Sequence, residues 1–278
     1  MNIHQSGKDV GVNHPGRLPI GIAAMSLIVA AALLWQAGGS SQAAWAADQK
    51  LAKDPATWKE ALSEKELENV VKLYAEEVKS KVLKSKGQFS SGYKKAVQAG
   101  HVFAIVGNAG TVMFEGDAAK TAAALREAGV ALAAAGKAKK FDEAKEALTK
   151  IEGYPKKIDP AESGAAAKWT EVTNLEAMME NVVGRIDTDV QKAIKSSGDF
   201  QKMSKELATR TRLLAGLAAV TREMKSEEPW QKFCDEMFES SLALSKQFAA
   251  KNQAGAKTAN DAVQKTCKTC HDKYNVKE

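Results

Sequence analysis

The chain has 278 residues, of which 44% are hydrophobic and 27% charged, and its formal net charge is +6. This balance is typical of a water-soluble globular protein and argues against disorder for the bulk of the chain. Lysines and glutamates alternate without a basic stripe of interleaved aromatics, which argues against a nucleic-acid-binding protein. Alanine, lysine, glutamate and leucine are abundant and prolines are few, so residue propensity favours an all-α fold.

The N-terminal residues have the features of a secretory signal. Two basic residues precede an apolar run over 20–35, and Ala44-Trp45-Ala46 matches an Ala-x-Ala cleavage site. We expect a signal peptide over 1–46, cut after Ala46, and a periplasmic or otherwise exported mature protein without a membrane span. An uncleaved membrane anchor is the alternative, which the short apolar run disfavours.

Two Asp-Pro pairs predict the starts of two equivalent helical units. Asp54-Pro55 and Asp159-Pro160 each place a capping Asp before a Pro suited to the first turn of a helix. The breaker-rich segment 153–157 lies between them and marks a boundary. We therefore expect two tandem four-helix bundles with up-down-up-down topology, over 47–155 and 156–278. The expected helices cover 56–85, 90–113, 117–136, 140–152, 161–196, 200–226, 229–251 and 256–276.

A degenerate internal repeat supports this division. Residues of the first unit recur in the second at one constant spacing along the chain. Trp58, Lys84-Ser85, Gly87 and Phe89 correspond to Trp169, Lys195-Ser196, Gly198 and Phe200. The chain therefore has the pattern of a duplication.

The first expected helix of the second unit has the apolar periodicity of a core-facing helix. Apolar side chains recur at alternating steps of three and four residues, namely Val172, Leu175, Met179, Val182 and Ile186. Core packing is a sufficient explanation for most of them.

The sequence Cys267-Lys268-Thr269-Cys270-His271, on the last expected helix, has the spacing of a c-type haem attachment site. Two thiols three positions apart on a helical turn can form thioether bonds to the two vinyl groups of one haem. The adjoining histidine then presents its imidazole to the iron. We expect one covalent haem c, bound through Cys267 and Cys270, with His271 as an axial iron ligand.

Other chemistries fit the same residues less well. A thioredoxin-like redox pair needs a strand-to-helix context, and no strand pattern is visible. A zinc site needs four ligands, whereas the chain after residue 46 offers only His101 and Cys234 as additional soft ligands, neither spaced as a pair. A structural disulfide across so short a loop would not explain the histidine.

His101 and Cys234 themselves have simpler interpretations. His101 lies on the second expected helix, and we interpret it as a surface or packing histidine in preference to a ligand for a non-covalent haem. Cys234 has no thiol partner once the two motif cysteines are used, so we interpret it as a small buried apolar residue. Intermolecular pairing of Cys234 is the alternative.

The motif and its position resemble class II cytochromes c, the group of cytochrome c′ and cytochrome c556. Members of this family carry Cys-x-x-Cys-His on the fourth helix of a bundle, often with an aromatic residue three positions later, where this chain has Tyr274. The resemblance covers about residues 160–278. It departs from the family at Asn275, where a basic residue is common.

The first unit resembles the same fold without the attachment chemistry. When Tyr154 is aligned with Tyr274, the positions of the two motif cysteines and the histidine hold Ala147, Lys150 and Ile151. The resemblance therefore implies a degenerate, haem-free bundle over 47–155.

The resemblance also places the residue on the opposite side of the iron in the first helix of the second unit. In the c556-like branch a Met ligates the iron, and in the c′-like branch an apolar residue leaves the site open. We expect Met179 to be the sixth ligand, with Leu175 as the blocking residue if the iron has five ligands. Met178 faces the ring only if the helix is rotated slightly.

These observations favour a non-enzymatic, exported cytochrome that transfers electrons to a redox partner protein. The first helix of the second unit offers no histidine for acid–base catalysis at the haem. Two alternatives stay open: a five-coordinate haem protein that binds nitric oxide or carbon monoxide, and an interaction module whose haem-free bundle docks a partner. Bundles of this kind often pair, so a homodimer is also open.

Overall fold

The computed structural model describes residues 55–274, and this part of the chain consists of helices and loops without a strand. The predicted all-α fold is confirmed. The expected signal peptide over 1–46, with its cleavage after Ala46, lies outside the described residues. No helix within residues 55–274 is long and apolar enough to cross a membrane.

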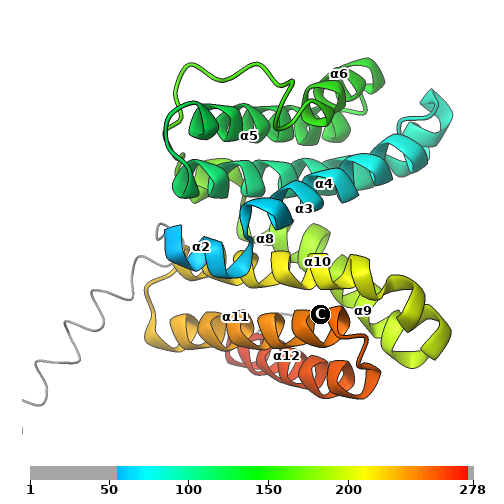
Figure 1. Cartoon of the computed structure of the whole chain (residues 1–278), viewed down its shortest axis with the longest axis vertical. Helices are drawn as coiled ribbons and strands as arrows, with labels where there is room; N and C mark the ends of the chain where they lie inside the picture. The colour runs from blue at the N-terminus through cyan, green and yellow to red at the C-terminus, as the bar shows by residue number, and fades with distance from the viewer. Residues whose placement is uncertain (1–54, 275–278) are drawn as a thin grey trace, which may run out of the picture. The chain divides into compact units, whose positions relative to one another are not determined.

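The first half of the described chain, residues 55–155, holds α2 (Pro55–Ala61), α3 (Glu64–Lys81), α4 (Lys86–Met113), α5 (Gly116–Lys137) and α6 (Phe141–Glu152) (Figure 1). The expected helix 56–85 is interrupted between α2 and α3. Ser63 begins α3 with a capping box, in which the Ser63 N–H donates to the Glu66 carboxylate at 2.8 Å and Glu66 N–H donates back to the serine hydroxyl. This reciprocal pair satisfies two helix-end donors and so favours a new start.

The second half, residues 156–274, holds α7 (Trp169–Val172), α8 (Leu175–Met178), the π-helical turn η2 (Met179–Val183), α9 (Gly184–Lys195), α10 (Ser197–Glu223), α11 (Glu228–Ala249) and α12 (Gln253–Tyr274). The prediction of one continuous helix over 161–196 is wrong. Residues 161–168 are not helical, and Thr173 is extended. Asn174 then caps α8 by accepting from the Ala177 N–H at 2.7 Å, which fixes a fresh helix start.

The internal repeat corresponds to a helix start that occurs twice. Ser85 caps α4 and Ser196 caps α10, each accepting a hydrogen bond of 3.2 Å from a backbone N–H. The phenylalanine that follows, Phe89 or Phe200, is buried in both halves. The repeated residues are therefore the cap and the apolar anchor of equivalent helices.

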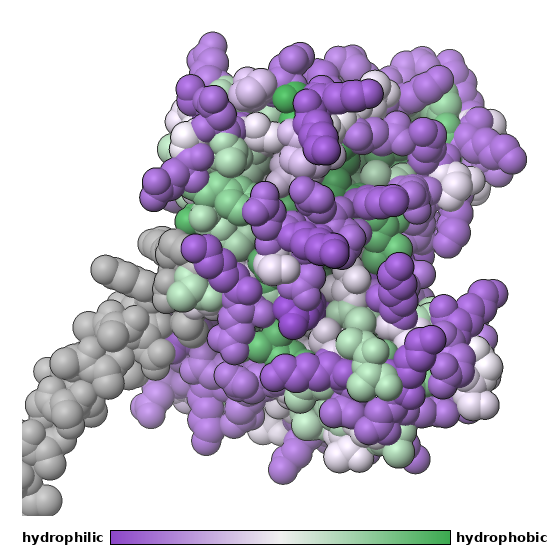
Figure 2. Space-filling model, viewed as in Figure 1, coloured by the Kyte–Doolittle hydropathy of each residue, from purple (hydrophilic) through white to green (hydrophobic). Residues whose placement is uncertain are grey.

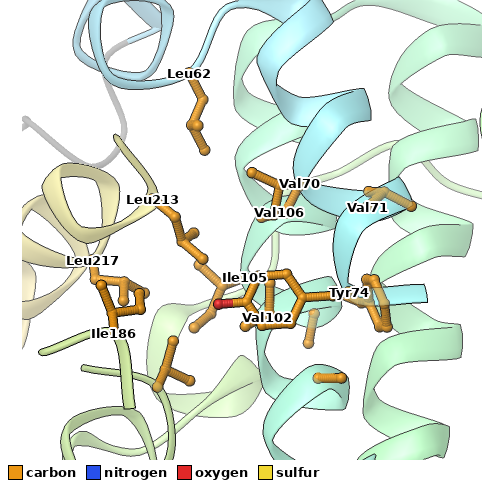
Figure 3. Close-up of a cluster of buried hydrophobic side chains, with 14 of the residues drawn as sticks. Leu62, Val70, Val71, Tyr74, Val102, Ile105, Val106, Ile186, Leu213 and Leu217 are labelled. Atoms are coloured by element: carbon orange, nitrogen blue, oxygen red, sulfur yellow. The ribbon is translucent and has the colours of Figure 1, made fainter. Parts of the chain in front are cut away.

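The two halves share one continuous apolar core. Buried side chains from α3, α4, α9 and α10 belong to one cluster, part of which Figure 3 shows around Tyr74. The indole rings of the repeat-related Trp58 and Trp169 lie against each other, with centroids 5.5 Å apart. The division into two domains stays a prediction from the repeat, because the packing of the described residues does not separate them.

Within the first half, α4 and α5 approach so closely that their backbones are in contact. A Cβ atom added to Gly100 would lie 2.5 Å from the Ala133 nitrogen, and one added to Gly129 would collide with the backbone at Ala104. Small residues at these facing positions let the two helices close the space between them.

The surface is polar, in agreement with the composition. Figure 2 shows hydrophilic residues over most of the viewed face, and Val130 is the exposed large hydrophobic side chain among the described residues. Exposed ion pairs include Lys79 with Glu152 at 2.8 Å. Pairs of this kind contribute little to stability because water and salt screen them.

We predict that Gly129→Ala lowers the free energy of unfolding by about 2 kcal/mol or more, since the new methyl group has no space between α4 and α5. Gly87→Ala is the matched control, because a Cβ atom there meets nothing within 4 Å. It should leave stability unchanged or raise it by up to about 1 kcal/mol. Urea unfolding followed by circular dichroism measures both; equal stability of the two variants would contradict the close approach.

Candidate haem-binding site

A cavity of about 200 Å³ lies in the second half among η2, α9, α10, α11 and α12. Its lining is largely apolar and includes Val183, Ile186, Leu214, Trp230, Phe233 and Met237. The space exists because α12 turns only small or medium-sized residues inward. Its buried positions are Ala256, Asn260, Val263 and Thr266, which do not fill the interior of a bundle as leucines would.

The residues of the predicted attachment motif meet at this cavity. Cys267, Cys270 and His271 all line it, and each side chain is half-buried. The two intervening residues are exposed, and Lys268 forms an ion pair with Asp272 at 2.9 Å on the solvent side of α12. The motif therefore presents its thiols and imidazole to the interior and its polar residues to water.

The cavity wall also contains Met179, which lies in the π-helical turn η2. The Gly184 N–H donates to the Met179 carbonyl, five residues back, so the turn holds one residue more than an α-helical turn. Such π-turns occur often at functional sites because they change which side chains face a given direction. Here Met179 and Val183 both line the cavity.

The structure separates the three candidate residues for the distal side. Met178 is fully buried in the core, with its sulfur 4.0 Å from the Thr221 hydroxyl, and does not line the cavity. Leu175 is half-buried and also lies away from it. Of the three candidates, only Met179, the residue expected to be the sixth ligand, lines the cavity.

Tyr274 closes the end of α12 and does not itself line the cavity. Its ring packs edge-on against Trp230, with centroids 5.3 Å apart, and its hydroxyl donates to Glu227 at 3.1 Å. The Lys225 ammonium group lies 4.5 Å from the Trp230 ring centroid and 4.9 Å from that of Tyr274. Tyr274 thus covers Trp230, which is part of the cavity wall.

Cys234 is buried, and the structure places it in the same cavity as the motif cysteines. Burial, together with the neighbouring Asp235 carboxylate, raises the pKa of the Cys234 thiol to about 12. The side chain is therefore a neutral thiol near physiological pH. The burial of Cys234 was expected from the sequence. Apart from the apolar residues next to it, nothing in the sequence indicates that it lies at the cavity.

A polar link spans the cavity rim between α9 and α12. The Gln264 amide donates to the Asp187 carboxylate at 2.5 Å, and both residues line the cavity. The sequence did not indicate that either residue belongs to the site. A carboxylate and an amide are ordinary side chains on a solvated helix face. Their contact is therefore visible only in the folded structure.

His101 lies outside this site. It lines a separate groove of about 570 Å³ beside α4 and α5, and its Nδ1 is 3.4 Å from the Thr173 hydroxyl. Burial, and then the nearby Lys137 ammonium group, lower its pKa. The neutral imidazole suits a packing role.

The equivalent positions of the first half carry no attachment chemistry. Ala147 and Ile151 are buried in the core, and Lys150 is exposed and paired with Glu146 at 3.1 Å. Within residues 55–274, no group of three or more His, Cys, Asp or Glu side chains could hold a bare metal ion.

The residues around the cavity fit a haem better than a bare metal ion. A haem requires an apolar cleft, two thiols in helical register and one or two axial donors for its iron. The cavity joins these donors to an apolar lining, and its motif side chains are half-exposed. A large planar group such as a haem could therefore extend beyond the enclosed cavity toward solvent at the motif.

Comparisons of the chain with models of protein families, with curated proteins and with solved structures find no match.

We predict that the protein carries one haem adduct in denaturing mass spectrometry and that Cys267→Ala/Cys270→Ala carries none. Both thiols face the cavity, and without them no thioether bonds can form. Cys234→Ala is the control and should retain one adduct, because this thiol is separate from the motif. Two adducts on the unaltered chain, or one on the double variant, would refute the assignment.

We also predict that Cys234 reacts with iodoacetamide at pH 8 at least about a hundredfold more slowly in the folded, haem-loaded protein than after unfolding in urea. The raised thiol pKa of about 12 leaves little thiolate, and burial restricts access. Peptide mass spectrometry measures the rate. Equal rates in the folded and unfolded states would show that the thiol is exposed.

Proposed function

We propose that the chain is an exported c-type cytochrome that carries electrons through one haem attached to α12. The observation that carries this proposal is the convergence of four side chains on one apolar cavity: two thiols, an imidazole and a thioether. They are Cys267, Cys270, His271 and Met179. Electron transfer requires no acid–base group, so we assign no catalytic residue.

In this proposal each side chain has a separate task. Cys267 and Cys270 would hold the ring covalently, and His271 of α12 would supply a ligand to the iron. Met179 of η2 would supply the second ligand. A haem bound in this way supplies one-electron redox chemistry at its iron. A thioether ligand and an apolar lining both favour the reduced iron, which raises the reduction potential and suits an electron carrier.

The same proposal includes the arrangement of the helices into bundles. We infer that the halves are two tandem four-helix bundles, built on α3 to α6 and on η2–α9 to α12, of which only the second holds a haem. The repeated caps at Ser85 and Ser196 support this inference. An exported location, with a redox partner protein in the same compartment, follows from the sequence pattern of residues 1–46.

One observation favours a second function, the binding of nitric oxide or carbon monoxide. Val183 lines the cavity on the same wall as Met179, so an apolar side chain is available beside the iron if the thioether does not ligate. The site would then be five-coordinate and open to a small gas.

We predict that Met179→Leu converts a low-spin ferric haem to high-spin, lowers the reduction potential and lets the ferrous protein bind carbon monoxide, because the sulfur ligand is lost. Met178→Leu is the matched control. Met178 is buried away from the cavity, and this exchange nearly conserves volume, so the spectrum should not change.

Visible and electron paramagnetic resonance spectra in both oxidation states measure these effects. A high-spin ferric spectrum for the unaltered protein, with ready carbon monoxide binding, would move the assignment to a gas-binding cytochrome. Absence of a haem spectrum from the exported protein would refute both functions.

A further inference from the structure

We infer that Glu77, in the first half of the chain, is a positioning residue for the haem site of the second half. It anchors the wall that carries Met179 and so sets how Met179 and His271 face each other. This inference rests on the proposed function, and it gives the haem-free half a part in tuning the iron.

A carboxylate on α3 is held by two guanidinium groups. Glu77 on α3 accepts from Arg185 of α9 at 2.5 Å through one oxygen and from Arg210 of α10 at 2.8 Å through the other. The side chains of Glu77 and Arg210 are only 9% and 2% exposed. Three helices from the two halves therefore meet at one buried charge cluster.

The negative charge of Glu77 is compensated by its neighbours. Burial by itself would raise the pKa of Glu77, but the guanidinium groups of Arg210 and Arg185 outweigh burial, so the pKa lies below its ordinary value. Arg210 also lies over the Tyr74 ring, 4.8 Å from its centroid. Since a buried charge that loses its partner is strongly unfavourable, these helices are held in one arrangement.

Arg185 connects this cluster to the distal wall. It is the second residue of α9 and follows Gly184, whose N–H donates to the Met179 carbonyl and ends the π-turn. The contact with Glu77 therefore fixes the point at which η2 passes into α9. A shift of Arg185 would move the turn that carries Met179.

A second tether holds α9 from the other side. Asp187 accepts from Gln264 of α12, the helix that carries His271. Between the two tethers, Ile186 lines the cavity and also belongs to the shared core around Tyr74 (Figure 3). The distance between Met179 and His271 thus depends on contacts made outside the cavity.

The test compares Glu77→Gln and Arg185→Gln with Glu152→Gln in the full haem-loaded protein. Glu152→Gln is the matched control. It breaks the exposed ion pair of Glu152, on α6, with Lys79, which lies on α3 as Glu77 does. Spectroelectrochemistry gives the reduction potential, and electron paramagnetic resonance gives the low-spin fraction. Circular dichroism confirms that each variant is folded at the temperature used.

We expect both cluster variants to lose low-spin signal and to lower the equilibrium constant for reduction about tenfold or more, which for one electron is about 59 mV. The control should change it less than twofold. A fall of the reduction potential in both variants distinguishes positioning from electrostatics. A purely electrostatic effect would raise the potential in Glu77→Gln, which loses a negative charge, and lower it in Arg185→Gln, which loses a positive one.

Shifts of opposite sign, or unchanged potentials in folded and haem-loaded variants, would overturn the positioning role and leave the proposed function intact. An exported protein without haem would instead overturn the proposed function, and this inference with it. If Glu77→Gln does not fold, the low-spin fraction of Arg185→Gln decides, because this variant leaves the pair of Glu77 with Arg210 in place and the loss of a positive charge alone would lower the potential without a loss of low-spin signal. Arg185→Lys should then restore the low-spin signal, since it can keep the ion pair with Glu77.

Discussion

The interior of a helical protein has to be filled to the density of a solid, and the two halves of this chain meet that constraint differently. In the first half, glycines such as Gly100 and Gly129 let α4 and α5 close the gap with their own backbones. In the second half, α12 turns small or medium-sized residues inward and leaves a cavity edged by thiols and an imidazole. A prosthetic group would complete that interior.

The features that the sequence predicts here are local ones. The helices expected over 90–113 and 200–226 are present as α4 and α10, which begin a few residues earlier than expected, and the spacing of Cys267, Cys270 and His271 places all three on one face of α12, where they line the cavity. These predictions succeed because each depends on residues a few positions apart.

The features that the sequence does not predict depend on long-range packing. Glu77 and Arg185 lie 108 positions apart, so no local pattern could pair them. The π-turn at Met179 inserts a residue without any capping or breaking residue to mark it, so the sequence predicted an uninterrupted helix there. Cys234 likewise has the sequence context of an ordinary buried cysteine, although it lies in the cavity.

The contact between the repeat-related tryptophans has an optical consequence. Trp58 and Trp169 come from different halves, and their indole rings lie 5.5 Å apart at an interplanar angle of 33°. At this separation and tilt the electronic transitions of the two rings couple, and the pair contributes an exciton signal to the circular dichroism. That signal requires both rings to be held together, so it provides an intrinsic spectroscopic marker of the joint between the halves.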